Sequence, residues 1–357
     1  MRRGMVIFSG SSHPSLTDDI CQQLSCYPAE RCLSKFSNNE TRFELHEEDV
    51  RDKGVFIVQS GSSQYHQVND YLMEILTMIH TCKAASAKKV VAVLPFFPYS
   101  RQPSTPYIMT TAATGAPPTT TSSSTLPSAF SDCSQPSYHY RFARAGTLVA
   151  NLLMWVDHII TLDLHDPQFQ GFFDCPVENL TTKSIITKYI QQHIPDHEEA
   201  VIVSPDAGGA KRATAIAEHL QMDFALIHGT RAKTVKRQKY DFFLVGNVKD
   251  RVCIIIDDII DTAYTITKAA KMLHENGATR IYALVTHAVL SGDALDRIQH
   301  SYLDRVVVSD SIYQNQCTIS CDKITTFSIA PLLAESIRRI HYGESISVLF
   351  DSAYKLF

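Results

Sequence analysis

Residues 254–270 combine two adjacent acids with a loop suited to phosphate. Asp257 and Asp258 end an apolar run that predicts a strand, and the loop after them opens directly into a helix. Backbone N–H groups at a helix start, together with threonine hydroxyls, suit a phosphate monoester, and carboxylates accept hydrogen bonds from vicinal hydroxyls. The pattern predicts a sugar-phosphate site, with a solvated cap at the strand end as the alternative. The loop residues are Asp261, Thr262, Ala263, Tyr264 and Thr265.

A second polar cluster lies between residues 161 and 179. Asp163 and His165 alternate with leucines in a strand predicted over residues 158–164, an arrangement that would put both polar side chains on one face. Asp174 and Glu178 follow shortly after. Carboxylates with few nitrogen ligands suit Mg²⁺ on a nucleotide polyphosphate better than zinc. From the residues alone, His165 fits a structural role as well as a functional one.

The third cluster, residues 204–213, is rich in glycine. Asp206 precedes Gly208 and Gly209, whose missing Cβ atoms let backbone amides approach a diphosphate. Lys211 and Arg212 follow on the next predicted helix. The motif is weak by itself, but together with the other two clusters it predicts a pyrophosphate site.

The elements that must position these clusters alternate between strands and helices. Short β-branched runs separated by helical patterns of about a dozen residues predict βα units and a parallel sheet, and therefore an α/β fold. Ligands of such sheets gather at the carboxyl ends of the strands. The predicted strands are residues 55–59, 90–96, 158–164, 200–205, 251–258 and 280–287, and the predicted helices are residues 70–83, 213–220 and 266–275.

The composition excludes several functional classes. The chain has 357 residues and a net charge of −4, which argues against a basic nucleic-acid-binding surface. Its hydrophobic content of 45% allows a real core and about two domains. The most apolar stretch, residues 90–99, is too short to cross a bilayer and contains prolines. With no signal-peptide pattern at residues 1–10, a cytoplasmic protein without membrane contact is expected.

Two further features of the composition concern thiols and a biased segment. Nine cysteines, an odd number without regular spacing, suggest free thiols, and the lone pair Cys317 and Cys321 makes a poor zinc site. In residues 103–137, 22 of 35 residues are Pro, Ser or Thr, which predicts a disordered surface loop. A tolerated insertion and a phosphorylated or partner-binding tether both remain open for it.

Eight motifs in order resemble those of ribose-phosphate diphosphokinase, the phosphoribosyl diphosphate (PRPP) synthetase family. The insertion after FFPYSRQ makes the chain most similar to the longer fungal members. The motifs are residues 9–16 (SGSSHPSL), 35–41 (KFSNNET), 58–61 (VQSG), 96–102 (FFPYSRQ), 163–180 (DLHDPQFQGFFDCPVENL), 203–212 (VSPDAGGAKR), 254–262 (IIIDDIIDT) and 334–350 (AESIRRIHYGESISVLF).

The resemblance implies a reaction and a set of site residues. The family transfers the diphosphoryl group of ATP to the 1-hydroxyl of ribose 5-phosphate with Mg²⁺, giving AMP and PRPP, the precursor for purine, pyrimidine, histidine, tryptophan and NAD synthesis. By resemblance, the catalytic residues are His165 and Arg231; ATP is bound by Phe36, Asn38, Glu40, Arg101, Gln102 and His165; metal is associated with Asp163, His165, Asp174, Glu178 and Asp206; the diphosphate loop has Asp206, Gly208 and Gly209; and ribose 5-phosphate is bound by Asp257, Asp258 and residues 261–265.

The family also implies an architecture of two similar phosphoribosyltransferase-type domains, each a mostly parallel sheet flanked by helices. We expect an ATP-binding domain over residues 1–182 that includes the insertion 103–137. A ribose-5-phosphate-binding domain would follow over residues 183–333, and residues 334–357 would pack back on the first domain. The family further implies a homo- or hetero-hexamer whose dimer interface helps form the ATP site, and a phosphate or ADP regulatory site near Ser345 and Ser347.

The chain departs from the family pattern at a few positions. Gly229 replaces a lysine of the loop that closes over the transferring phosphates, although Arg231 is kept. Loss of one preorganised cation can cost several kcal/mol of barrier, and Lys233 or Lys236 is a possible substitute. Tyr264 stands where glycine is common, and Asn38 where many members have Asp. Two hypotheses follow: a catalytic subunit, or a catalytically weak subunit that regulates or stabilises an active homologue. A phosphoribosyltransferase that consumes PRPP ranks last, because it does not explain residues 35–41 and 163–173.

Overall fold

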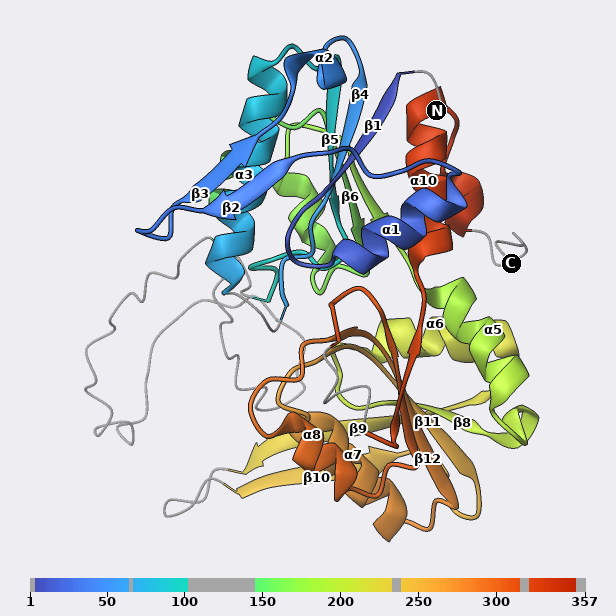
Figure 1. Ribbon diagram of the computed structural model, residues 1–357. Helices are drawn as coiled ribbons and strands as arrows, with labels where there is room; N and C mark the ends of the chain where they lie inside the picture. The colour runs from blue at the N-terminus through green and yellow to red at the C-terminus, as the bar shows by residue number, and fades with distance from the viewer. Residues whose placement is uncertain (1–3, 64–66, 102–144, 233–238, 315–320, 351–357) are drawn as a thin grey trace, which may run out of the picture.

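The computed structural model of the chain describes residues 4–63, 67–101, 145–232, 239–314 and 321–350 (Figure 1). The insertion 103–137, Gln102, Lys233, Lys236 and Cys317 lie outside these residues, as do the side chains of residues 229–232 and 239–242. Two sheets, one above the other in Figure 1, organise the described chain. We call each sheet with the helices packed on it the N-terminal or the C-terminal domain.

The N-terminal domain is built on five parallel strands in the order β1-β4-β5-β6-β7. The strands read as continuous apolar runs because both faces of the sheet are covered. Phe56 and Val58 of β4 pack with α1 and α10, whereas Val55 and Ile57 pack with α3 and α4. The elements are β1 (Met5–Ser9), α1 (Pro14–Gln23), α2 (Glu47–Val50), β4 (Gly54–Val58), α3 (Val68–Ala84), β5 (Lys89–Leu94), α4 (Ala145–Leu152), β6 (His158–Leu162), η1 (Pro167–Phe172) and β7 (Val177–Leu180).

The C-terminal domain has seven strands in the order β10-β9-β8-β11-β12-β13-β14, and only the β9–β10 pair is antiparallel. Helices α7 and α8 cover one face of this sheet, and α5 and α6 cover the other. The elements are α5 (Lys183–His193), η2 (His197–Glu199), β8 (Val201–Ser204), α6 (Ala210–Leu220), β9 (Asp223–Ala232), β10 (Lys239–Val245), β11 (Val252–Ile260), α7 (Tyr264–Glu275), β12 (Arg280–Ala288), α8 (Ala294–Gln299), β13 (Arg305–Ser309) and β14 (Ile324–Phe327).

The chain returns to the N-terminal domain after β14. Helix α10 (Ala330–Tyr342) and the short η3 (Ser347–Phe350) bury Leu333, Ile337 and Leu349 in the same core as β1, β4 and α1. Figure 1 shows α10 beside α1, next to the chain's first strand. The helix begins four residues before residue 334, where the sequence analysis placed the start of this segment.

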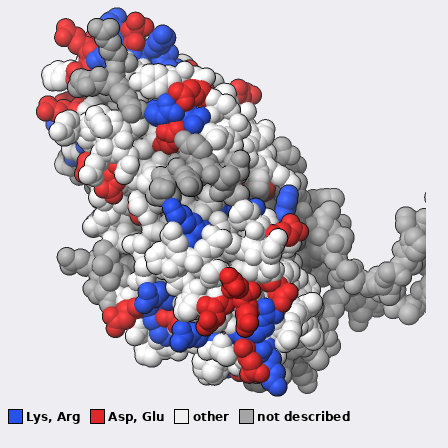
Figure 2. Space-filling model, turned by 90° about the vertical axis from the view of Figure 1, so that its right-hand side faces the viewer, with Lys and Arg blue, Asp and Glu red and all other residues white. Residues whose placement is uncertain are grey.

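A two-stranded hairpin, β2 (Cys32–Lys35) and β3 (Thr41–Glu44), forms a separate small sheet. In Figure 1 it projects sideways from the N-terminal domain, with its turn at the far end. On the face of the molecule in Figure 2, Lys and Arg lie interspersed with Asp and Glu. Among the described residues, no helix is long and apolar enough to cross a membrane. The seven cysteines in the described part of the chain are free thiols.

The observed elements confirm the predicted α/β class. The carboxyl ends of the predicted strands differ by one or two residues, and the differences at β6 and β11 affect the predicted site. β6 ends at Leu162, because Asp163 takes a left-handed backbone conformation with φ 38°. The prediction that Asp163 and His165 share one face of a strand is therefore wrong. β11 continues past Asp258 to Ile260, because Ile259 and Ile260 pair with β12. The two acids thus lie inside the strand, near its carboxyl end.

Candidate functional site

An open pocket of about 610 Å³ lies at the carboxyl end of β11 and the start of α7. Two of its lining residues, Arg101 and His165, come from the N-terminal domain. The others come from β11, the loop after it and the start of α7, and from the loop after β8 and helix α6. The pocket gathers most of the sugar-phosphate and diphosphate residues expected from sequence. Its lining consists of Arg101, His165, Asp206, Gly208, Gly209, Arg212, Asp257, Asp258, Ile259, Ile260, Asp261, Thr262, Ala263, Tyr264, Thr265 and Ile266.

Asp258 joins the two domains on the pocket wall. His165 Nδ1 donates to Asp258 Oδ2 at 2.6 Å, and Arg212 lies 3.3 Å from Asp258 Oδ1. Burial alone would raise the pKa of Asp258, but the His165 hydrogen bond and the Arg212 charge outweigh it and lower that pKa far below its usual value. The same hydrogen bond raises the pKa of His165 against the opposing effect of burial. The contact is therefore an ion pair across the domain boundary.

Asp257 has the opposite electrostatic character. Burial, followed by the charge of Asp258, raises the pKa of Asp257 well above its usual value. The backbone N–H of Asp258 donates to Asp257 Oδ1 at 2.9 Å. Two carboxyl groups this close do not both ionise readily in a buried place, which agrees with the opposite pKa shifts of Asp257 and Asp258.

The loop of residues 261–265 turns from β11 into α7. Ala263 caps α7 with a left-handed backbone (φ 59°), and the first turn of the helix directs its backbone N–H groups toward the pocket side of the loop. Arg297 donates to the Thr262 carbonyl at 2.7 Å, and Arg101 forms an ion pair with Asp261. A helix of 12 residues adds its dipole to those amides, which favours an anion there.

The glycine loop after β8 forms a second, tighter turn on the pocket wall. Gly209 N–H donates to Asp206 Oδ1 at 2.9 Å, and the Ser204 hydroxyl donates to the Asp206 carbonyl at 2.7 Å. A Cβ on Gly209 would lie 3.1 Å from Ser204 Oγ, and one on Gly208 would lie 3.3 Å from Asp206 Oδ1. Side chains would crowd the turn, so the glycines keep its backbone amides accessible to a ligand.

The five residues expected to bind metal are not gathered at one place. His165 and Asp206 line the pocket. Asp163 is buried and bonded to Thr182 and Thr286. Glu178 contacts His158 at the amino end of β6, and Asp174 precedes β7; neither lines the pocket. Within the described ranges, no three His, Cys, Asp or Glu residues form a group that could hold a metal.

The expected adenine-binding residues lie on the β2–β3 hairpin, outside this pocket. Phe36 is 49% exposed, and the Arg42 guanidinium lies 5.9 Å from the centre of its ring. Asn38 Oδ1 accepts a hydrogen bond from the Glu40 N–H at 3.2 Å, which shapes the turn. Within one chain, these three residues do not meet His165 or Asp258.

Arg231 and Gly229 lie in β9, whose backbone pairs with β10 at Tyr240 and Phe242. Ser204, the last residue of β8, is level with Leu226, so β9 runs several residues beyond the carboxyl end of β8. The backbone of Gly229 and Arg231 therefore lies beyond the carboxyl end of β8, the strand that leads to the glycine loop.

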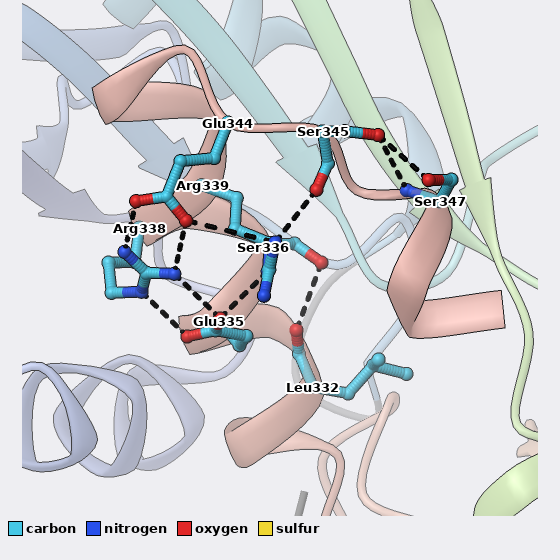
Figure 3. A network of polar contacts seen from close by, with 8 residues as sticks. All are labelled: Leu332, Glu335, Ser336, Arg338, Arg339, Glu344, Ser345 and Ser347. Carbon is cyan, nitrogen blue, oxygen red and sulfur yellow. Dashed lines mark hydrogen bonds and ion pairs between the residues drawn. The ribbon is translucent and has the colours of Figure 1, made fainter. Parts of the chain in front are cut away.

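The segment expected to be regulatory follows α10 and is held by ion pairs (Figure 3). Glu335 accepts hydrogen bonds from Arg338 and Arg339, and Glu344 accepts a pair from Arg338. Arg339 also donates to the Ser345 carbonyl at 2.9 Å, and the Ser345 and Ser347 hydroxyls are 2.8 Å apart. The regulatory role of Ser345 and Ser347 stays a prediction.

Three residues have contacts at the site that the sequence did not predict. Arg212 was expected in the pyrophosphate cluster, and the structure also pairs it with Asp258. Thr286 and His287, at the end of β12, contact the N-terminal domain. Both residues could have been found from sequence, because they are a pair of polar residues at the end of an apolar strand, the same pattern that singled out Asp257 and Asp258.

Comparisons with known proteins agree with this geometry. Residues 5–112 match the family described as the N-terminal domain of ribose phosphate pyrophosphokinase, and residues 232–351 match the phosphoribosyl synthetase-associated domain. The chain is 51% identical over 354 residues to ribose-phosphate pyrophosphokinase 5 of Schizosaccharomyces pombe, covering 98% of each chain. It is 41% identical over 350 residues to ribose-phosphate pyrophosphokinase 2 of the same yeast, covering 97% of each. A crystal structure of phosphoribosylpyrophosphate synthetase from Mycobacterium smegmatis is 32% identical with a TM-score of 0.79, covering 96% of this chain and 100% of that one.

Proposed function

The chain belongs to the ribose-phosphate pyrophosphokinase family, and on this premise we propose that it makes PRPP from ATP and ribose 5-phosphate. The family assignment confirms the resemblance on which the sequence analysis relied. The observation that carries the proposal is the pocket in which the 261–265 loop and Asp257–Asp258 meet His165 of the other domain.

The ribose 5-phosphate would bind in the part of the pocket formed by β11 and α7. The 5-phosphate would be held by the first turn of α7 and the Thr262 and Thr265 hydroxyls, where backbone N–H groups favour an anion. The ribose hydroxyls would donate to Asp258, whose lowered pKa keeps it an acceptor at neutral pH. A volume of about 610 Å³ is ample for a sugar phosphate and a diphosphate together.

Mg²⁺ with ATP is typical of the family, and the pocket residues fit such an ion. Asp206 is exposed at the pocket wall, and His165 lies on the opposite wall. Mg²⁺ is commonly held by one or two carboxylates together with substrate phosphates and waters, so a large protein cage is not needed. The ion would neutralise phosphate charge; Asp163, Asp174 and Glu178 are not among the residues that line the pocket.

The residues of the chain would act mainly by positioning and charge neutralisation. Arg101 and Arg212 put cationic groups on the pocket wall, and the hydrogen bond to Asp258 raises the pKa of His165 beside them. An in-line transfer at the β-phosphorus of ATP needs its two reactants aligned and its developing charge offset. The glycine loop of residues 206–209 would cradle the diphosphate as it is transferred.

The adenine of ATP would be held at a contact between subunits. Phe36, Asn38 and Glu40 sit on a hairpin that projects from its own domain, and a half-exposed aromatic ring is suited to stack on a base. We therefore include homologous subunits in the proposal, as a homo- or hetero-oligomer of cytoplasmic location in which the hairpin of one subunit serves the pocket of another.

A catalytically weak subunit is the second candidate, because Gly229 lies in β9 where the family has a lysine. The deciding experiment incubates the purified chain alone with Mg-ATP and ribose 5-phosphate and follows AMP and PRPP. Equal amounts of both products confirm autonomous activity. No turnover alone, with stimulation of a co-expressed homologue, overturns it in favour of the second candidate.

Gly229→Lys measures the cost of the missing lysine in the same assay. Restoring one preorganised cation is expected to raise kcat by about 10²-fold. Gly229→Gln is the matched control, because it adds a side chain of similar length without the charge. Equal rates for the two variants would show that the missing charge is not the defect.

A further inference from the structure

The carboxyl ends of β6 and β12 meet in a buried polar seam between the two domains. His287 of β12 lies against the Leu162 carbonyl, the last residue of β6, with Nε2 at 3.1 Å. Burial lowers the pKa of His287, so the imidazole is neutral and its Nε2–H donates to that carbonyl. Thr286, the residue before it, is fully buried and contacts Asp163. Two consecutive residues of one domain thus contact two consecutive residues of the other.

One oxygen of the Asp163 carboxylate accepts three hydrogen bonds in this seam. This oxygen, Oδ2, accepts from the Thr182 N–H at 3.2 Å, from the Thr182 hydroxyl at 2.5 Å and from the Thr286 hydroxyl at 2.7 Å. Asp163 is 7% exposed, and both threonines are 1% exposed or less. Hydrogen bonds to a charged acceptor are among the stronger ones. Oδ2 is therefore fully engaged by protein donors from both sides of the seam.

The backbone around Asp163 is fixed by hydrogen bonds, as its side chain is. Asp163 N–H donates to the Leu180 carbonyl at 2.9 Å, and Leu164 N–H donates to Asn179 Oδ1 at 3.0 Å. With φ 38°, Asp163 occupies a conformation that a non-glycine residue keeps only where its surroundings enforce it. This turn sends the chain toward His165, which reaches Asp258 two residues later.

We propose that Asp163 is a positioning residue: through Thr286 it ties the N-terminal domain to β12 and thereby holds His165 on Asp258 at the pocket. The role replaces the metal-binding role that the family resemblance implied for Asp163. Its kinetic consequences rest on the proposed function, whereas its structural consequences do not.

Thr286→Val removes the hydroxyl of this contact at nearly constant volume. Thr286→Val leaves every residue of the expected metal set in place, so a lower kcat with an unchanged Mg²⁺ requirement would indicate positioning. We expect kcat to fall at least tenfold in Thr286→Val and in Asp163→Asn, while the Mg²⁺ concentration for half-maximal activity stays within twofold. Thr286→Ser, which keeps the hydroxyl, should restore most of kcat. The kcat of the double variant should be no lower than that of the less active single variant, because both substitutions remove the same interaction.

Thr161→Val is the matched control. Thr161 is fully buried in β6, two residues before Asp163, and its hydroxyl has no hydrogen-bond partner among the described residues. We expect its activity to match that of the unaltered chain. A tenfold rise in the Mg²⁺ requirement of Asp163→Asn, with Thr286→Val indistinguishable from Thr161→Val, would overturn the proposal and restore the metal role.

Hydrogen exchange followed by mass spectrometry separates this proposal from the proposed function. Peptides covering residues 163–168 should exchange at least tenfold faster in Thr286→Val than in Thr161→Val, because the loop loses its tie to β12. Unchanged exchange would overturn the proposal even in a fully active enzyme. If the chain alone makes no PRPP, the exchange rates still test whether Asp163 has the proposed positioning role. If Thr286→Val fails to fold, Thr182→Val removes the other hydroxyl donor and is expected to give the same faster exchange.

Discussion

Asp257 and Asp258 are neighbours whose carboxyl groups have opposite pKa shifts. Asp258 faces His165 and Arg212, which lower its pKa, whereas burial and Asp258 itself raise the pKa of Asp257. The sequence predicted that both acids belong to the site, because two carboxylates before a loop and helix form a local pattern. It could not predict which one is ionised, because the deciding partner, His165, lies 93 positions away in the chain.

The charge of Asp258 is testable by Asp258→Asn, which keeps the shape and removes the charge. We expect ribose 5-phosphate to bind at least tenfold more weakly, since hydrogen bonds to a charged group contribute about 1.5–3 kcal/mol. ATP binding should change less than twofold. Isothermal titration with each ligand makes the measurement, with the exposed Asp250→Asn as control. An equal loss of affinity for both ligands would contradict the assignment of Asp258 to the ribose.

Tyr264 narrows the rim of the pocket. Its ring is 62% exposed, and Lys268 Nζ lies 5.6 Å from the ring centre. Tyr264→Gly should lower KM for ribose 5-phosphate severalfold by opening the phosphate loop, at a cost of about 1 kcal/mol in helix stability. Tyr264→Phe keeps the ring and should leave KM unchanged. The crowding argument is wrong if Gly and Phe give the same KM in steady-state assays.

Strands and helices were predictable where their signal is local. The apolar runs of β4, β5, β8 and β12 are long and covered on both faces, so composition alone marks them. The end of β6 was not predictable, because Leu164 continues the alternation and only the turned backbone of Asp163 stops the strand. The position of the β2–β3 hairpin, away from the pocket of the same chain, could not be predicted either, because it depends on tertiary contacts.

Helix α10 completes the core of a domain whose strands lie far earlier in the chain. Leu333 is fully buried there, so Leu333→Ala should lower the free energy of unfolding by about 3 kcal/mol. Leu148 of α4 is 60% exposed, and Leu148→Ala should change that free energy by less than about 0.5 kcal/mol. Urea unfolding followed by circular dichroism measures both. Equal effects would mean that α10 packs loosely on the N-terminal sheet.

At the scale of the whole molecule, a second contact between the domains sets the response to pH. The His13 ring, at the start of α1, lies 5.3 Å from that of Tyr313, and the backbone of Asp310 acts against burial to raise the pKa of His13. The Asp310 carboxylate accepts from the Ile329 N–H at 2.8 Å, just before α10. Burial lowers the pKa of His13 to about 4 and, with a smaller contribution from Asp19, raises that of Asp310 to about 6.

These two shifts act in opposite directions on stability. His13 has a lowered pKa, so its contribution to the free energy of unfolding is complete above pH 6.5 and is lost as the pH falls toward 4. Asp310 has a raised pKa, so its contribution to the free energy of unfolding is complete below pH 3.8 and is lost as the pH rises through 6. Between pH 4 and 6 the two effects largely cancel.

Asp310→Asn should remove this compensation while keeping an acceptor for Ile329. Between pH 6 and pH 4 the variant should lose up to about 3 kcal/mol relative to the unaltered chain, since one pKa unit corresponds to about 1.36 kcal/mol. Urea unfolding of both proteins at pH 6.5, 5.5 and 4.5 makes the comparison. A stability difference that does not change with pH would show that Asp310 does not hold its proton in the folded state.

The return of α10 to the first sheet also sets an order of events during protein synthesis. Ribosomes release the chain from its N-terminus, so β1 to β7 emerge first, yet the face that α10 covers stays bare until residue 350 has been made. The C-terminal domain can close its own core while α10 is still inside the exit tunnel. The half of the enzyme that is translated first is therefore the half that finishes folding last.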